Sequence, residues 1–476
     1  KLINSTAGMF HKSNKFYFGL GVSLNQSIGD SIPPVIVDSS ITLEGYRNYF
    51  DIKNISLSGG YKLNDLWEIK FRSSILSSDF NARYFYTTNT FDKSTEITSN
   101  WFNRVQFQRK TNLGSTLDIN ASYKRSNDEF IFSPDFPSTN SHTMDFINFT
   151  INSSKEITKK IKLKSGLQGD FRKIESNDRG NHSDYHFGGY LMGVYKSNNM
   201  VFTAIAREDY DQNYGFEFCP QLSASYSMNN IVLRASAGKS IRAADYTERY
   251  VSNNIVELTP ERSLGNPNLI AEKGWSEEIG INYYPFKNIL FKATAFSRQS
   301  KNIIDYILTN ESDIGNVSDI GSLYPGADYF FAKNINDVYV NGLELELNTK
   351  FIISENKILG WQIGYTFTEI NNDNLGIYLS SFAKHLINSQ IILKYNSLQF
   401  SISSLYKERK QQLAESISST LESNYALLNG RIGYEIKNGV YFNIQILNIT
   451  NTNYQNILGA KMPGRWLMGG IKWDIK

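Results

Sequence analysis

The sequence predicts an all-β fold, a transmembrane antiparallel β-barrel, from three observations. Apolar and polar residues alternate at period two over long runs, short turns alternate with long polar loops, and helical periodicity is almost absent. Aromatic residues make up 14% of the 476 residues, and prolines number only 10. That composition suits long, regular strands whose faces are half exposed.

The expected strands follow one another along the whole chain. Residues 1–63 hold two to four strands, and "NKFYFGLGVSLNQS" and "KNISLSGGYKL" are the clearest of them. Later runs place apolar residues on one face and Lys, Asp, Gln, Ser or Thr on the other. The clearest apolar faces are Leu117, Ile119, Ala121 and Tyr123; Ile161, Leu163, Leu167 and Phe171; Trp361, Ile363, Tyr365 and Phe367; and Leu467, Gly469, Ile471, Trp473 and Ile475.

The connections between these runs are of two kinds. Short links rich in Asn, Asp and Gly, such as 63–66 and 228–231, supply the positive φ angles of tight hairpins. They alternate with long polar connections such as 243–273 and 309–329. A bacterial outer-membrane barrel has short periplasmic turns and long extracellular loops. The pattern therefore predicts a barrel of 22 strands, with 20 as the alternative.

The chain is expected to form a single domain, because no linker or change of composition divides residues 1–476. In the hydrocarbon core every backbone group needs a partner within the sheet, and closing the sheet removes both edges. The final strand is therefore expected to pair with the first. Apolar faces would contact outer-membrane lipid, and polar faces would line a wet interior.

Several classes of protein are excluded by composition and motifs. The net charge of +3 and the scattered basic residues argue against a nucleic-acid partner. Cys219 is the single cysteine, so no intramolecular disulfide is expected. The sequence contains no run of 18 apolar residues, so no membrane-spanning helix is expected. Gly-rich phosphate loops, nucleophile elbows and zinc spacings are missing too, so neither an enzyme nor a cofactor is expected.

One group of charged residues is a candidate site. Arg242, Asp245, Glu248 and Arg249 begin a long polar loop, and loops carry function more often than strands do. A ligand or partner contact is one interpretation of these residues. A local salt-bridged hairpin is the alternative interpretation, and the one that we favour.

A second group, His182, Asp184 and His186, is not expected to hold a metal. An i, i+4 histidine pair forms a metal site on a helix. This stretch is instead expected to be a loop that enters a strand, where the spacing loses that meaning.

Two stretches resemble the TonB-dependent outer-membrane receptors. The first, 238–284, contains "IRAADYTERY" and then "GNPNLIAEKGW", similar to the family's Arg-Ala-Pro-like turn, acidic-aromatic loop and "GNP-L--E". The second, 440–473, contains "LNITNTNYQN" and "PGRWLMGGIKW", similar to the family's final segments. The stretches 73–87 and 339–347 fit the same pattern, so the resemblance spans most of the chain.

This resemblance implies energised uptake of a scarce, large nutrient such as a ferric siderophore, haem, cobalamin or a glycan. In that family a plug domain fills the barrel, and the inner-membrane TonB complex pulls on a segment ahead of the plug. No plug lies ahead of the first strands here, and residues 1–13 look like the crossing from plug to barrel. The plug is expected in cis, in a longer polypeptide, or in trans.

Two alternatives to energised uptake stay open. One is a passive, porin-like channel. The other is a structural or docking barrel in a larger envelope complex, with long loops that bind a partner such as a surface lipoprotein.

Overall fold

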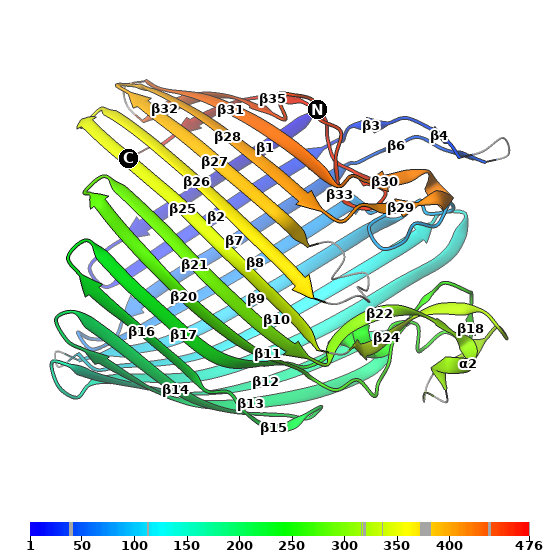
Figure 1. Cartoon of the computed structure of the whole chain (residues 1–476), viewed down its shortest axis with the longest axis horizontal. Coiled ribbons are helices and arrows are strands. Elements are labelled where there is room, and N and C mark those ends of the chain that lie inside the picture. Colours follow the sequence, from blue (N-terminus) through cyan, green and yellow to red (C-terminus); the bar gives the residue numbers. More distant parts are fainter. Residues whose placement is uncertain are drawn as a thin grey trace.

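In the computed structural model, the chain forms one large antiparallel β-sheet that curls into a nearly closed barrel (Figure 1). The structure describes residues 1–37, 41–111, 114–315, 317, 320–335, 337–371, 382–436 and 439–475. The predicted all-β barrel is confirmed, and over these residues its main sheet contains the expected 22 strands. Among the described residues, no helix has the length and apolar character needed to cross a membrane.

The strands of the barrel wall are long and follow the chain in order. Their bounds are β1 (Leu2–Lys12), β2 (Phe16–Ser27), β7 (Phe50–Lys62), β8 (Trp67–Asn81), β9 (Thr95–Lys110), β10 (Thr116–Ser133), β11 (Phe136–Glu156), β12 (Ile161–Ser176), β13 (Gly180–Lys196), β14 (Met200–Asp211), β15 (Gly215–Phe218), β16 (Gln221–Met228), β17 (Ile231–Arg242), β20 (Glu272–Phe286), β21 (Ile289–Lys301), β25 (Val338–Ser354), β26 (Lys357–Asn371), β27 (Ala383–Tyr395), β28 (Leu398–Arg409), β31 (Asn424–Ile436), β32 (Val440–Leu447) and β35 (Trp466–Trp473).

Short turns lie at one end of the barrel, the turn end, and long loops lie at the other, the loop end (Figure 1). The loops carry the smaller elements. These are β3 (Ser31–Ile32), β4 (Val35–Ile36), β5 (Thr42–Leu43), β6 (Tyr46–Arg47), α1 (Tyr246–Tyr250), β18 (Glu257–Leu258), β19 (Ser263–Leu264), β22 (Ile303–Asn310), α2 (Glu311–Ile314), β23 (Ser322–Leu323), β24 (Asp328–Ile335), β29 (Gln412–Ala414), a 3-10 turn (Glu415–Ile417), β30 (Ser419–Leu421), β33 (Gln455–Ile457) and β34 (Ala460–Lys461).

The 22 strands occupy 21 positions around the wall, because β15 and β16 share one position. Both pair with β14: Glu208 lies opposite Phe218, and Ile205 lies opposite Gln221. Pro220 sits between the two segments and has no backbone N–H to donate to a ladder, so the strand is interrupted there. Counting β15 and β16 together, 22 strands minus one gives 21 positions.

The predicted closure of the final strand against the first is wrong for this structure. β1 pairs with β2 over eleven positions, and β35 pairs with β32, but within the described residues no ladder joins β1 to β35. Neighbouring strands alternate in direction, so the first and last of 21 positions run the same way and cannot form an antiparallel pair. Residues 2–12, which overlap the segment considered as a crossing, lie in the wall as β1.

The two faces of the wall are sorted as the alternation predicts. In β12, Leu163, Leu167 and Phe171 point outward and are 39%, 65% and 43% exposed. Between them, residues such as Gln168 and Asp170 face the lumen, where they hydrogen-bond to each other. The outer surface is therefore an apolar belt, as a bilayer requires.

Placing a charge on this belt should destabilise the barrel. Ile279, in the middle of β20, is 67% exposed on the outer face, and Ile279→Lys is expected to cost about 2–4 kcal/mol of unfolding free energy. Urea titration in lipid vesicles, followed by tryptophan fluorescence, measures the loss. The matched control is Ser236→Lys, which places the same charge opposite Glu278 on the lumen face. Equal losses in both variants would contradict the assignment of faces.

The fully apolar cores lie at the loop end. One contains Ala244, Leu269, Ile304, Tyr306 and Ala332, and a second contains Leu258, Leu264, Ile314, Tyr329 and Phe331. Both are built from the loop between β17 and β20 and the loop between β21 and β25. A third core joins three other loops through Leu43, Tyr84, Ala414 and Ile417.

Candidate functional site

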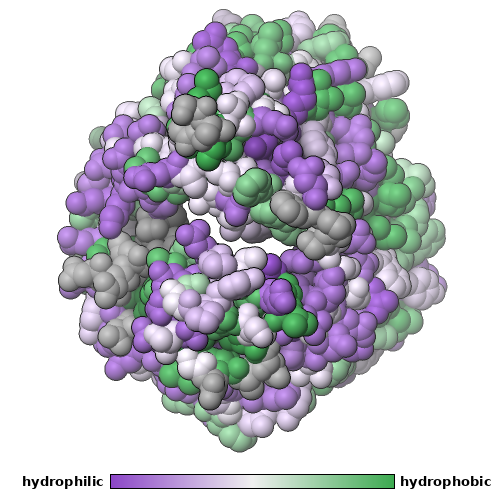
Figure 2. Space-filling model, turned by 90° about the vertical axis from the view of Figure 1, so that its right-hand side faces the viewer, coloured by the Kyte–Doolittle hydropathy of each residue, from purple (hydrophilic) through white to green (hydrophobic). Residues whose placement is uncertain are grey.

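The loop end of the barrel is the candidate site. Figure 2 looks onto this end and shows a hollow at its centre, surrounded largely by hydrophilic residues. Two loops, 243–271 and 302–337, fold together at this end, and we call them the loop pair. β24 pairs antiparallel with β22 and parallel with β19, and β18 pairs with β23, so strands from both loops are joined. The loop pair is thus an ordered platform.

The predicted site residue Arg242 lies at the centre of an ionic network. It donates two hydrogen bonds to Glu248, each 2.9 Å long, and two to Glu272, at 2.7 and 2.6 Å. Glu248 is only 5% exposed. A bidentate guanidinium–carboxylate pair is a strong, directional contact. Arg242 therefore ties the end of β17 to α1 and to the start of β20.

Asp245 and Arg249, the other two predicted residues, also make contacts within the protein. The Asp245 side chain accepts from the Glu248 backbone N–H at 2.8 Å, and the Glu248 carboxylate accepts from the Asp245 N–H at 2.9 Å. This is a reciprocal capping box at the start of α1. Arg249 donates to Asn213 and to the Pro267 carbonyl oxygen. A role of these four residues in binding a ligand stays a prediction.

The "GNPNLIAE" motif holds α1 in place from the other side. The Gly265 N–H donates to the Val251 carbonyl at 2.9 Å, and the Asn266 N–H donates to the Glu248 carbonyl at 3.0 Å. Leu269 is buried in the first loop core, and Glu272 completes the Arg242 network. Glu272 was not among the site residues predicted from the sequence.

Gly265 has a specific steric reason to lack a side chain. A Cβ at this position would lie 2.4 Å from the Tyr250 backbone nitrogen and 2.6 Å from the Arg249 carbonyl carbon. Gly265→Ala is therefore expected to cost about 1–3 kcal/mol of loop stability, because backbone must shift. Hydrogen exchange of residues 243–271 measures the cost. Asn268→Ala, an exposed position in the same motif, is the control and should leave exchange unchanged.

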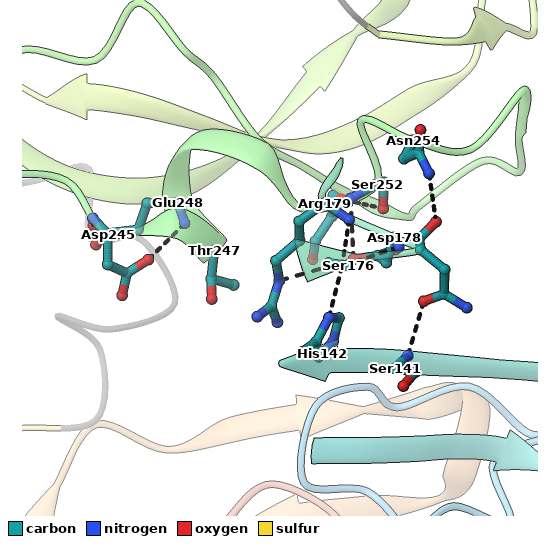
Figure 3. Close-up of polar contacts among 12 residues, drawn as sticks. Ser141, His142, Ser176, Asp178, Arg179, Asp245, Thr247, Glu248, Ser252 and Asn254 are labelled. Atoms are coloured by element: carbon teal, nitrogen blue, oxygen red, sulfur yellow. Dashed lines mark hydrogen bonds and ion pairs between the residues drawn. The ribbon is translucent and has the colours of Figure 1, made fainter. Parts of the chain in front are cut away.

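The loop pair is anchored to the wall at the β12–β13 hairpin. Asp178, 1% exposed, accepts hydrogen bonds from the Ser252 backbone N–H and from Arg262, each 3.3 Å long. Figure 3 shows Asp178 of this hairpin beside Ser252, in the segment that follows α1, and Asn254 of the same segment donates to the Asn177 carbonyl at 3.0 Å. The loop is thus fastened across β14–β16 to a distant part of the wall.

Aromatic packing strengthens the same anchor. The ring of His182 stacks on Tyr250, with centroids 3.6 Å apart and planes at 6°. The Tyr246 hydroxyl donates to the Arg172 carbonyl at 3.2 Å, and burial raises the pKa of that hydroxyl well above its usual range. α1 is therefore packed closely against β12 and β13.

The other residues of the histidine group also have partners. His186 lies between Asp170 and Asp209, with nitrogen–oxygen distances of 3.3 and 2.9 Å, and Asp184 pairs with Arg172 at 2.5 Å. Within the residues that the structure describes, no group of three or more His, Cys, Asp or Glu side chains is arranged to hold a metal ion.

A second part of the loop end, which was not predicted from the sequence, is aromatic. Tyr86 is 64% exposed, packs edge-on against Phe130 at 5.4 Å and lies 6.4 Å from Phe85. Its hydroxyl donates to Glu96 at 2.7 Å. Phe85 and Tyr86 lie in the loop that follows β8, and Phe130 lies near the loop-end terminus of β10. They offer flat apolar surface to a bound molecule.

The loop that carries Tyr86 is held by a buried carboxylate. Asp92 is 0% exposed and accepts hydrogen bonds from the backbone N–H groups of Tyr84 and Ser94, both at 2.8 Å. Burial raises the pKa of Asp92. Tyr84 has a φ of 64°, which is unusual for a residue other than glycine, and the Asp92 contact fixes this conformation.

Comparisons with solved structures show the same fold at low sequence identity. The siderophore receptor PirA from Pseudomonas aeruginosa matches with a TM-score of 0.72 and 13% identity, over 98% of this chain and 76% of that one. A variant of the ferric enterobactin receptor PfeA from Pseudomonas aeruginosa matches with a TM-score of 0.78 and 12% identity, over 98% and 77%. The FrpB iron transporter from Neisseria meningitidis gives 0.77 and 12%, over 99% and 79%.

The sequence itself identifies the family. A search of curated protein sequences gives no significant match. Residues 4–451, however, match the family model described as TonB dependent receptor-like, beta-barrel. This match covers nearly the whole wall, from β1 to the end of β32. The chain is therefore an outer-membrane barrel, a transporter rather than an enzyme, and belongs to the TonB dependent receptor-like β-barrel family.

Proposed function

We propose that this barrel takes up a scarce, large nutrient by energised transport, and that the nutrient is a ferric siderophore, haem, cobalamin or a glycan. The main observation that supports this proposal is that a wall of 21 strand positions is combined with a folded loop pair at one end. A barrel of this size encloses a lumen that its own side chains cannot fill.

The exposed aromatic rings at the loop end are suited to a ligand with flat or ring-shaped parts. Tyr86 and Phe85 present exposed rings beside the buried acids of the neighbouring strand ends. The three similar structures named above are a siderophore receptor, a ferric enterobactin receptor and an iron transporter. At 12–13% identity these structures indicate the fold alone. The ligand class is therefore supported by the exposed aromatic rings and is tested by the experiment below.

The proposal includes a plug domain and the TonB complex as partners. A plug, in the same polypeptide or as a separate chain, would occupy the lumen and contact its polar wall. The lumen wall carries charged side chains such as Lys292 and Glu346, which pair at 3.1 Å. A plug could bind to such a polar, hydrated surface and dissociate from it during transport. The inner-membrane TonB complex would act through the plug.

Uptake by whole cells tests this function. Cells with and without the gene are given iron-55-labelled ferric enterobactin, haem, cyanocobalamin or a fluorescent oligosaccharide, before and after a protonophore collapses the proton gradient. We expect gene-dependent accumulation of at least one probe, and its fall to the level of the deletion strain after collapse. Accumulation that survives collapse would instead indicate a passive channel. A barrel that transports none of these probes and co-purifies with stoichiometric envelope proteins would indicate a docking role.

A further inference from the structure

Basic residues gather on three neighbouring turns at the turn end of the barrel. These turns join β9 to β10, β11 to β12 and β13 to β14, which are consecutive strands of the wall. Over 109–115, 155–161 and 195–200 the sequence has six basic residues and one acid, Glu156. Although basic residues are scattered along the chain as a whole, the fold brings these six to one side of the barrel end. We call them the basic rim: Arg109, Lys110, Lys155, Lys159, Lys160 and Lys196.

Backbone contacts give the basic rim a defined shape. The Thr158 hydroxyl accepts hydrogen bonds from the backbone N–H groups of Lys160 and Ile161, at 3.1 and 3.0 Å. The link 157–160 is therefore a fixed turn. The Lys196 N–H donates to the Lys160 carbonyl at 2.7 Å, which joins this turn to the next one. The lysines of these two turns thus lie side by side.

The charges of the basic rim are exposed and unpaired. Within the part of the chain that the structure describes, none of the six side chains forms an ion pair. The acid of these turns, Glu156, is the register partner of Lys162, which faces the lumen. By contrast, Lys70 and Lys292 on the lumen face each lie 3.1 Å from a glutamate. The basic rim is therefore available to an anion outside the barrel.

An aromatic girdle marks the membrane boundary at the same end. Outward-facing aromatic side chains that are 41–65% exposed occupy the last three positions of six strands: Tyr61, Tyr195, Tyr226, Tyr395, Tyr434 and Trp473. Such girdles lie where the wall of an outer-membrane barrel meets the lipid headgroups. On the outer face, Tyr195 opposes Ile161 in register, and Lys155 opposes Leu163, two residues further along β12. Lys155 thus lies at the level of the headgroups.

The outer surface beside the basic rim is apolar. Leu163 and Leu191 are 39% and 57% exposed on the face that carries Lys155. Arg109 lies on this face too, opposite Trp67 in register and 5.7 Å from the centre of its ring. A molecule with an anionic head and apolar chains matches both features. A soluble acidic protein would reach the tips of the turns, but not the side chains that face lipid.

We propose that the basic rim binds the phosphate headgroup of an anionic phospholipid, of the phosphatidylglycerol class, in the membrane leaflet at the turn end. Short turns of outer-membrane barrels face the periplasm, and phospholipids form the leaflet on that side. Each basic residue held at an anionic membrane surface strengthens the attraction about fivefold. The acyl chains of the lipid would pack along Leu163 and Leu191. The proposal does not depend on which molecule is transported.

Native mass spectrometry of the full polypeptide, purified from outer membranes in detergent, tests the proposal. The probes are palmitoyl-oleoyl phosphatidylglycerol and palmitoyl-oleoyl phosphatidylcholine, which share their acyl chains and differ in head charge. The rim variant is Lys155→Gln with Lys160→Gln. Its matched control is Lys162→Gln with Lys164→Gln, which removes two lysines of the same segment from the lumen face. A third variant, Lys155→Arg with Lys160→Arg, keeps the charge of the basic rim.

We expect the unmodified barrel to bind phosphatidylglycerol at least about tenfold more tightly than phosphatidylcholine. The rim variant should lose about 25-fold in affinity for phosphatidylglycerol and none for phosphatidylcholine, because two charges are removed. The control and the arginine variant should bind both lipids as the unmodified barrel does, and high salt should weaken the preference. Equal affinity for the two lipids, or an equal loss in the rim variant and the control, would overturn the proposal. Unchanged phosphatidylglycerol binding in the rim variant would overturn it too, and loss of a co-purifying acidic protein from that variant would instead make the basic rim a protein-binding surface.

Discussion

Replacing Tyr329 with alanine is expected to unfold the loop pair while the barrel wall stays folded. Tyr329 is 0% exposed at the centre of the second loop core, where it packs with Leu258, Leu264, Ile314 and Phe331. Its hydroxyl donates to the Leu258 carbonyl and accepts from the Tyr324 N–H, both at 2.9 Å. Removing a buried aromatic side chain costs about 3–5 kcal/mol. A loop core this small has few other contacts to offset such a loss.

Hydrogen exchange of residues 243–271 and 302–337, together with limited proteolysis of intact cells, measures the effect. Tyr329→Phe keeps the packing and loses only the two hydrogen bonds, so it should cost about 1–3 kcal/mol. Tyr324→Ala removes a ring that is 51% exposed in the same loop and should change little. If Tyr329→Ala also abolished the heat-modifiable migration of the folded barrel, the loop pair and the wall would form one cooperative unit.

The barrel wall could be predicted from the sequence because apolar and polar residues alternate along its strands with a period of two. Lipid outside and water inside impose the same two-residue alternation on every strand, so runs such as 161–172 reveal both faces. Closure could not be predicted in this way. It depends on whether the number of wall positions is odd or even, and the break at Pro220 and the short loop strands of residues 28–49 make that number ambiguous.

The folding of the loop pair could not be predicted, because the residues that form its core follow no repeating spacing in the sequence. Leu258, Leu264 and Tyr329 each come from a short, mostly polar segment, and they meet only through the pairing of β18, β19, β23 and β24. Local salt bridges among Arg242, Asp245, Glu248 and Arg249 were one of the two interpretations of the sequence, and the Arg242–Glu248 pair is such a contact. Glu272, which pairs with the same Arg242 guanidinium, lies thirty residues after Arg242 in the sequence, and only the fold brings the two side chains together.

Replacing Glu248 with glutamine should loosen α1 and distinguish the two interpretations of the charged group. Glu248 is buried, and it accepts two hydrogen bonds from Arg242 and one from the Asp245 backbone. Breaking a buried ion pair from one side costs about 3–5 kcal/mol. Arg242 is partly exposed and keeps Glu272, so we expect about 2–3 kcal/mol here.

The exchange rates of the Gly265 and Asn266 amides report this loss, because both amides donate to the segment 248–251. Glu257→Gln, an exposed acid in the same loop, should leave these rates unchanged. In a double-mutant cycle with Arg242→Gln, the two losses should be less than additive, since each single variant removes the same pair. If Glu248→Gln instead left exchange unchanged and abolished uptake of the transported probe, the carboxylate would contact the ligand directly. Faster exchange with weakened uptake would mean that Arg242 and Glu248 serve transport by keeping the loop pair folded at the loop end of the barrel.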